Sequence, residues 1–219
     1  MHGRSRATHG QRLRVSDAGV GERRDVEPLR DGDRTIVTAC PHCFNVIANE
    51  YGQLGGFFQV VHHSVYLERL LASGRLQIGR DGAPARNVTY HDPCYLTRYN
   101  GIEAAPRDAL ASVPGLQLEE MERHGRNTFC CGAGGGRMWM EETRGTRINH
   151  ERTRQALETG ADTVAVACPF CMVMLKDGLA DAGRGPGTDD AVAIADIAEL
   201  LAESAVPANG SSRQLPVLQ

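Results

Sequence analysis

A short segment occurs twice in the sequence, and each copy joins a strand-like run to two cysteines. The segment reads VTACPHCF at residues 37–44 and AVACPFCM at residues 165–172. β-Branched and apolar residues before each Cys-Pro-X-Cys motif predict a strand, and the proline predicts the first turn of a helix. A second strand and a Leu-Leu helix are predicted after each copy, beginning near Gln59 and Val192. Strands that alternate with helices in this way indicate an α/β fold with a mainly parallel sheet.

The sequence between the two copies continues this alternation. It predicts a strand at residues 87–90, a helix opened by Pro106 and a strand at residues 116–119. The polar span Met138–Glu158 predicts one long surface helix. The continuously apolar run at residues 163–167 predicts a strand that is buried on both faces of the sheet.

The seven cysteines all fall inside short motifs, and none is scattered elsewhere. An odd number of cysteines in a chain without an export signal argues against a disulfide scaffold. Reduced cysteines serve as metal ligands, as nucleophiles or as small buried apolar residues. Their clustering in this sequence favours metal ligation.

Five of these cysteines form the more informative set: Cys94, the adjacent pair Cys130 and Cys131, and the pair Cys168 and Cys171. Each follows a predicted strand, and open α/β sheets gather ligands at the ends of their strands. Adjacent cysteines, with Cα atoms about 3.8 Å apart, reach two irons of a cluster more easily than two corners of one tetrahedral ion. A structural zinc ion takes four ligands and would leave one cysteine over. The set therefore predicts an iron–sulfur cluster, with a structural zinc site as the alternative.

The remaining pair, Cys40 and Cys43, has a different interpretation if it is taken alone. A Cys-X-X-Cys motif at a helix N-terminus lowers the pKa of its first thiol and supports thiol–disulfide exchange. A thiol–disulfide redox module without a cluster is therefore a second alternative.

Glycines and histidines next to the cysteines suggest how the site is built. The glycine-rich run at residues 132–136 lacks the Lys-Ser or Lys-Thr ending of a phosphate-binding loop. Its small residues would instead let backbone N–H groups approach the sulfur atoms. We expect His62, His63 and His91 to be hydrogen-bonding residues and not ligands, since the thiolates suffice.

The charge balance and the apolar pattern exclude other classes of function. Lys and Arg number 24 against 27 Asp and Glu, a net charge of −3, so a nucleic-acid partner is not predicted. No run of about 18 apolar residues occurs, so no transmembrane segment is predicted. The Arg-rich N-terminus lacks the apolar stretch of a secretory signal, and a cytoplasmic location is predicted.

At Cys94, Cys130-Cys131-Gly132 and Cys168-Pro169-Phe170-Cys171 the chain resembles the cysteine-rich CCG domain of heterodisulfide reductase. The same domain occurs in the iron–sulfur subunits of glycolate oxidase and of lactate utilisation. The resemblance extends from about Thr35 to Leu201 and is closest to the C-terminal part of actinobacterial iron–sulfur oxidoreductases, which end in a pair of such domains.

This resemblance implies a four-iron four-sulfur (4Fe-4S) cluster on each complete domain, held by the five-cysteine set and non-cubane in the reductase. It implies an oxidoreductase or electron-transfer subunit whose partner is a flavoprotein dehydrogenase or another electron-transfer subunit. A quinone or a disulfide is the implied substrate.

The chain departs from the family pattern in its first half, where only Cys40 and Cys43 of a first cysteine set are present. We therefore expect a truncated member with one cluster, and an incomplete second site at this pair unless a partner chain completes it. The predicted organisation is a disordered segment at residues 1–33, a partial first CCG domain at 34–79, a complete second CCG domain at 86–204 and a disordered tail at 205–219.

Overall fold

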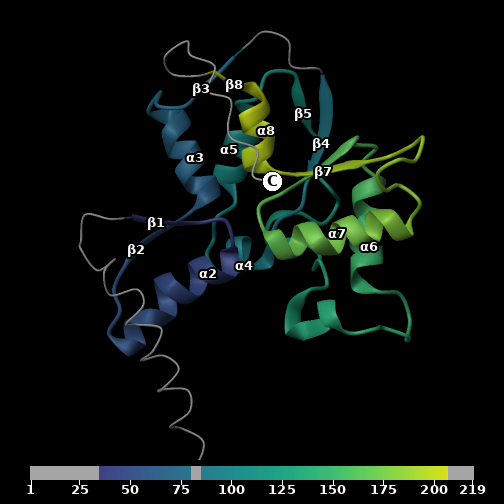
Figure 1. Ribbon diagram of the computed structural model, residues 1–219, viewed down its shortest axis with the longest axis horizontal. Helices are drawn as coiled ribbons and strands as arrows, with labels where there is room; N and C mark the ends of the chain where they lie inside the picture. The colour runs from purple at the N-terminus through teal and green to yellow at the C-terminus, as the bar shows by residue number, and fades with distance from the viewer. Residues whose placement is uncertain (1–34, 80–84, 207–219) are drawn as a thin grey trace, which may run out of the picture.

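The computed structural model describes residues 35–79 and 85–206 (Figure 1). The segment at residues 1–33 and nearly all of the tail, both predicted to be disordered, lie outside the described residues. The strands are β1 (Thr35–Thr38), β2 (Gln59–His62), β3 (Gln77–Ile78), β4 (Arg86–Tyr90), β5 (Leu116–Leu118), β6 (Thr163–Val166), β7 (Ala193–Asp196) and β8 (Ala205–Val206). The α-helices are α2 (Pro41–Asn45), α3 (His63–Ala72), α4 (Cys94–Thr97), α5 (Ala104–Ala111), α6 (Ile148–Leu157), α7 (Pro169–Asp181) and α8 (Ile197–Ser204).

Four strands form a parallel sheet in the order β5-β4-β6-β7, which confirms the predicted α/β class. In this sheet Val88 of β4 lies opposite Thr163 of β6, and Val164 of β6 lies opposite Ile194 of β7. All four residues of β6 are buried, as its continuously apolar sequence predicted.

Helices cover both faces of this sheet, and the two faces have separate cores (Figure 1). On one face Val164 and Val166 pack with Leu175 and Leu179 of α7. On the other face the core is formed by residues of β4, β6 and the loop after β6 with residues of α4, α5 and α8, namely Val88, Tyr90, Leu96, Leu110, Ala165, Ala167, Ile197 and Leu200. Each large apolar side chain buried in these cores contributes roughly 1.5–3 kcal/mol, which fixes β4 and β6 and hence the loops that follow them.

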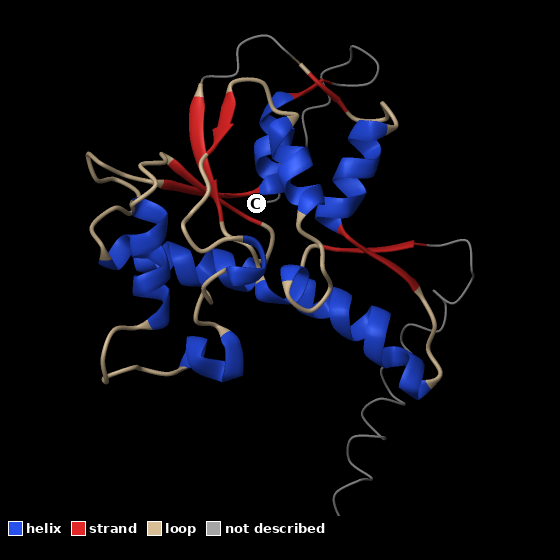
Figure 2. Cartoon of the chain, turned by 180° about the vertical axis from the view of Figure 1, so that it is seen from behind, coloured by secondary structure: helices blue, strands red, loops and turns tan. Residues whose placement is uncertain are grey.

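The predicted repeat is visible in the fold. Strands β1 and β2 pair in parallel, with Thr35 opposite Gln59, as β6 pairs in parallel with β7. Figure 2 shows the β1–β2 ribbon apart from the four-stranded sheet. The domain boundaries at residues 79, 86 and 204 stay a prediction. Ala205–Val206, which that prediction assigns to the tail, pair in antiparallel fashion with Gln77–Ile78.

The prediction of one long helix at residues 138–158 is wrong. Residues Gly134–Trp139 form a short 3-10 turn, and α6 begins only at Ile148. Gly145 lies between them with a positive φ of 67°, a conformation that interrupts an α-helix. Helix α6 is also not a surface helix, since it buries several polar side chains, namely Asn149, Arg152, Thr153 and Gln155.

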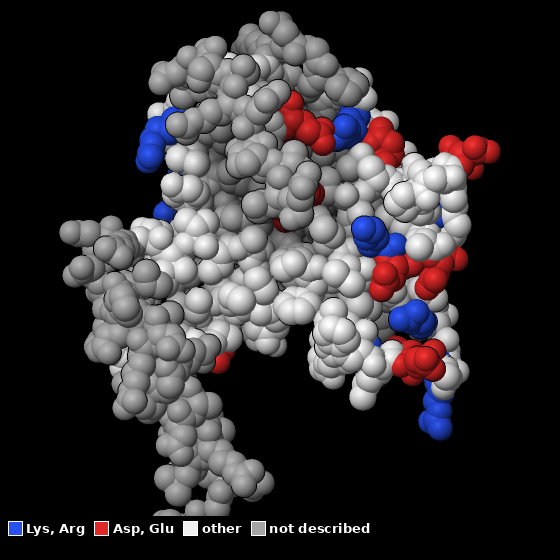
Figure 3. Space-filling view, in the orientation of Figure 1, with Lys and Arg blue, Asp and Glu red and all other residues white. Residues whose placement is uncertain are grey.

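Charged side chains on the face shown in Figure 3 are of mixed sign. Most lie on the side that carries α6 and α7, and the described residues of this face form no basic patch. This distribution agrees with the balanced composition. No described helix has the length and apolar character needed to cross a membrane.

Candidate metal centre

Cys40, Cys94 and Cys168 lie where strands end and helices begin, whereas Cys130 and Cys131 lie in the loop before the 3-10 turn Gly134–Trp139. Cys168 follows β6 and immediately precedes α7, as Cys40 follows β1 and precedes α2. Cys94 is the first residue of α4, shortly after β4. Because β4 and β6 are parallel neighbours, their carboxyl ends bring Cys94 and Cys168 to the same edge of the sheet.

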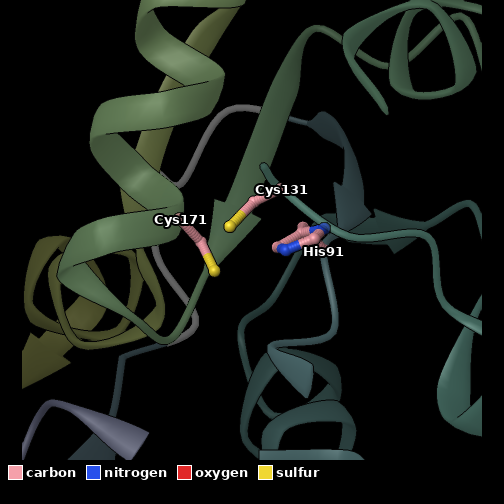
Figure 4. Close-up of side chains that lie close together, drawn as sticks. All are labelled: His91, Cys131 and Cys171. Atoms are coloured by element: carbon pink, nitrogen blue, oxygen red, sulfur yellow. The ribbon is translucent and has the colours of Figure 1, made fainter. Parts of the chain in front are cut away.

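The sulfur atoms of all five predicted ligands meet at this edge. The thiol of Cys131 is hydrogen-bonded with those of Cys130 and Cys171, and Cys171 is hydrogen-bonded in turn with Cys168. Cys94 lies close enough for its charge to interact with Cys131 and Cys168. Figure 4 shows the side chains of Cys131 and Cys171 turned toward each other. All seven cysteines are free thiols.

Hydrogen bonds between the thiols set their relative acidity. The bond from Cys130, and next the bond from Cys171, hold the pKa of Cys131 far below its usual range. The bond with Cys131 correspondingly raises the pKa of Cys171. For Cys94 burial is the main effect, and it raises the pKa. Cys131 and Cys168 are thus the more acidic thiols of the set, and a positive metal centre would favour the thiolate form of all five.

Helix α7 adds a second stabilising element at Cys168. The pKa of this thiol is lowered first by the hydrogen bond from Cys171, then by that from Cys40, and also by the backbone N–H groups of Cys171 and Phe170. These N–H groups belong to the first turn of α7, where the helix dipole favours negative charge. Pro169, at the first position of α7, carries no N–H group of its own, but the N–H groups of Phe170 and Cys171 that follow it remain free to point at the sulfur.

The first cysteine pair reaches this centre through Cys40. Cys40 is hydrogen-bonded with Cys168, and this contact is the main cause of the raised pKa of Cys40. Cys43 is exposed. The ring of His42 packs on Tyr95 with 4.2 Å between ring centroids, and this contact holds α2 against α4.

His91, predicted as a hydrogen-bonding residue, is buried beside the sulfur atoms. One of its ring nitrogens lies within 4.8 Å of the sulfur atoms of Cys131 and Cys171 (Figure 4). Burial lowers the pKa of His91, so the ring is neutral at neutral pH. The other two histidines have other partners: His62 bonds Ser64, and His63 bonds Asp196 at 2.8 Å.

Arg152 of α6 is the residue that sequence reasoning missed. Its side chain is fully buried, and its Nε donates to Nδ1 of His91 at 2.9 Å. Burial lowers the pKa of Arg152 to about 10, which still leaves it charged at neutral pH. No signal in the sequence separates this arginine from its exposed neighbour Arg154, because both lie in the same polar helix.

Gly132 brings a backbone N–H group to a sulfur atom, as predicted for the glycine-rich run. Its N–H donates to Sγ of Cys130, with 3.3 Å between nitrogen and sulfur. Its φ is +93°, and a Cβ atom there would lie 3.2 Å from the backbone nitrogen of Asn149. Gly134, in contrast, has no heavy atom within 4 Å of such a Cβ. Only the first of these glycines is therefore required by close packing.

We expect Gly132→Ala to destabilise the protein by about 1–2 kcal/mol, because alanine is strained at positive φ. It should also weaken retention of any metal held by Cys130. Thermal unfolding and metal content of the purified variant measure both effects. Gly134→Ala is the matched control and should change neither. Equal behaviour of the two variants would contradict this assignment.

Comparison with known proteins agrees with this geometry. The family model of the cysteine-rich (CCG) domain matches residues 88–176, a range that contains all five clustered cysteines. A probable iron–sulfur-binding oxidoreductase of Bacillus subtilis is 43% identical over 177 residues, which are 80% of this chain and 24% of that protein. An EtfAB:quinone oxidoreductase of Syntrophomonas wolfei is 37% identical, over 78% of this chain and 24% of that protein.

One component of a dihydromethanophenazine:CoB–CoM heterodisulfide reductase, from Methanosarcina barkeri, is 35% identical over 186 residues, which are 83% of this chain and 44% of that component. The chain thus spans about a quarter of the length of the first two relatives and less than half of the third. The chain belongs, through residues 88–176, to the cysteine-rich CCG domain family that its cysteine pattern resembles.

Proposed function

We propose that this chain holds an iron–sulfur cluster on Cys94, Cys130, Cys131, Cys168 and Cys171 and passes electrons as part of an oxidoreductase. The observation that carries the proposal is the meeting of these five free thiols at one sheet edge. Relatives are named as iron–sulfur-binding and quinone oxidoreductases and as a component of heterodisulfide reductase, which supports the same chemistry.

The donor set fits such a cluster. Thiolates are soft ligands that select iron–sulfur clusters, zinc or copper(I), and five of them exceed the four positions of one tetrahedral ion. An apolar shell of Met174, Met138 and Ala133 surrounds Cys131, Cys168 and Cys171. Nε2 of His91 is buried beside these sulfur atoms, and the ring is hydrogen-bonded with the thiol of Cys131. The N–H group at Nε2 can therefore donate to a sulfur atom of an iron–sulfur cluster bound here.

The protein residues would control how that group exchanges electrons. When bound, the cluster supplies a centre that accepts and returns single electrons. Met174 and Met138 pack against the buried cysteines and limit the access of water, and the N–H groups of Gly132, Phe170 and Cys171 favour the more negative state. Phe170, which is 37% exposed, lies between Cys168 and Cys171 in sequence and marks the side from which an electron donor or acceptor can approach.

The finer parts of the proposal concern the kind of cluster and its partners. We propose one 4Fe-4S cluster for each chain, because Cys40 and Cys43 alone cannot complete a second set. The contact of Cys40 with Cys168 supports a location of such a second site directly beside the first, where a partner chain could complete it. A flavoprotein dehydrogenase is the proposed donor, and a quinone or a disulfide is the proposed acceptor.

Anaerobic purification tests the proposal. We expect a brown protein with about four irons and four sulfides for each chain. Dithionite should reduce the centre, and a quinone analogue should reoxidise it without loss of iron. A colourless protein with one stoichiometric zinc would establish the structural alternative, and irreversible loss of iron on mild reduction would exclude an electron relay.

A further inference from the structure

The buried guanidinium group of Arg152 has only neutral partners. Its nitrogen atoms donate to Nδ1 of His91 at 2.9 Å, to the backbone oxygen of Arg123 at 2.8 Å, to Oε1 of Gln155 at 3.0 Å and to Oγ1 of Thr128 at 3.2 Å. Among the described residues no carboxylate is hydrogen-bonded to it. A buried cation is normally paired with an anion. The negative groups that act on it most strongly are the buried carboxylate of Asp92 and, next, the cysteines of the metal centre, Cys171 and Cys131.

The contact between Arg152 and His91 fixes where the imidazole carries its proton. A guanidinium group offers only donors, so Nδ1 of His91 must be the acceptor and carries no hydrogen. The proton of a neutral imidazole is then on Nε2. This nitrogen is buried and belongs to a ring that is hydrogen-bonded with the thiol of Cys131 and has a nitrogen within 4.8 Å of the sulfur atoms of Cys131 and Cys171.

We propose that Arg152 holds His91 in the Nε2–H tautomer, so that His91 donates a hydrogen bond to sulfur at the metal centre and does not ligate a metal ion. The inference rests on the proposed iron–sulfur function, and it adds that His91 and Arg152 control the redox potential of the cluster. A neutral imidazole can ligate only through a nitrogen without hydrogen, and Arg152 already occupies that nitrogen.

This arrangement stabilises the reduced state of the centre. A hydrogen bond to sulfur and a nearby positive charge both favour the form with the additional electron. Arg152 would therefore act as a positioning residue through His91 and as a counter-charge to the thiolates. Its effect should appear in the potential and not in the number of irons.

Two substitutions of His91 separate a donor from a ligand. His91→Leu removes the hydrogen bond, and His91→Gln retains its polarity, with an amide N–H toward sulfur and an amide oxygen toward Arg152. We expect both variants to keep the iron content of the native protein. The reduction equilibrium of His91→Leu should shift about tenfold toward the oxidised state, which is about 59 mV for one electron. The potential of His91→Gln should stay close to the native value.

Two substitutions of Arg152 test the positioning role. Arg152→Met removes both the charge and the donor to Nδ1 and should lower the potential at least as far as His91→Leu does. Arg152→Gln retains an amide donor to Nδ1 without the charge and should give an intermediate potential. Both potentials are measured by anaerobic titration followed with electron paramagnetic resonance.

A measurement on the native sequence does not depend on whether these variants fold. In protein labelled with 15N-histidine, the reduced cluster should show only the weak nitrogen coupling of a hydrogen-bonded imidazole, together with an exchangeable deuteron in heavy water. Strong coupling to a directly bound nitrogen, or iron loss in His91→Gln, would show ligation and overturn the inference. An unchanged potential in folded His91→Leu would also overturn it. A native protein without iron and sulfide would refute the proposed function itself, and the inference with it.

Discussion

Replacing Cys171 with serine is expected to remove more than half of the iron bound to this protein. Cys171 is 2% exposed, and its thiol is hydrogen-bonded with those of Cys131 and Cys168, so it lies in the middle of the sulfur cluster. A serine hydroxyl is a hard, protonated ligand that binds iron far more weakly than a soft thiolate does. The nearly isosteric change leaves the packing of α7 intact, so the loss reports ligation.

Cys43→Ser is the matched control for this variant. Cys43 belongs to the equivalent motif of the first unit, but its side chain is exposed and should be dispensable for iron binding. Iron and sulfide are measured after anaerobic purification of both variants, with thermal unfolding as the test of folding. If Cys171→Ser retained as much iron as Cys43→Ser, the proposed ligand set would be wrong.

The position of Cys131 changes the ranking of the five ligands. If a cluster needs only four cysteine ligands, one of the adjacent cysteines Cys130 and Cys131 would be dispensable. The structure places Cys131 among Cys130, Cys171 and His91, with 6% of its surface exposed. Cys131→Ser should therefore reduce iron binding as strongly as Cys171→Ser does. Its effect should exceed that of Cys130→Ser, because Cys130 lies at the margin of the cluster.

The strands and cysteine loops could be predicted because their signals are local. The apolar run of β6 and the proline after Cys168 specify a buried strand that leads into a helix. The contact between Cys40 and Cys168 could not be predicted, since it depends on how two units pack. The same limit explains the error over α6, where polar residues such as Arg152 indicate solvent exposure but are satisfied by loops distant in sequence.

Asp92 is another residue whose role emerges only from the packing. It lies between His91 and Cys94 in sequence, and its carboxylate is fully buried. Its two oxygens accept hydrogen bonds from Arg107 at 2.8 and 2.9 Å, and Oδ2 also accepts from the backbone N–H of Gly125 at 2.8 Å. This carboxylate therefore joins the loop that carries two residues of the centre to α5 and to the turn at Gly125.

Replacing Asp92 with alanine is expected to lower the apparent melting temperature by about 6–20 °C. Removing one partner of a buried ion pair costs about 3–5 kcal/mol, because Arg107 and the N–H of Gly125 lose an acceptor that water cannot replace. In a protein of this size each kcal/mol lowers the melting temperature by about 2–4 °C. Arg107 retains Glu120 as a partner, at 2.6 Å, and this contact places the effect toward the lower end of the range.

A second variant of Asp92 and a control variant separate the contribution of its charge from that of its hydrogen bond to Gly125. Asp92→Asn keeps an acceptor for Gly125 but removes the charge that Arg107 binds, so its melting temperature should fall between those of Asp92→Ala and the native protein. Glu203→Gln is the control, since its pair with Arg86 is 55% exposed on the glutamate side and should contribute nothing measurable. Iron content should fall in Asp92→Ala, because the proposed ligand Cys94 loses the framework that positions it. Native melting and native iron content in Asp92→Ala would show that the loop is held by other contacts.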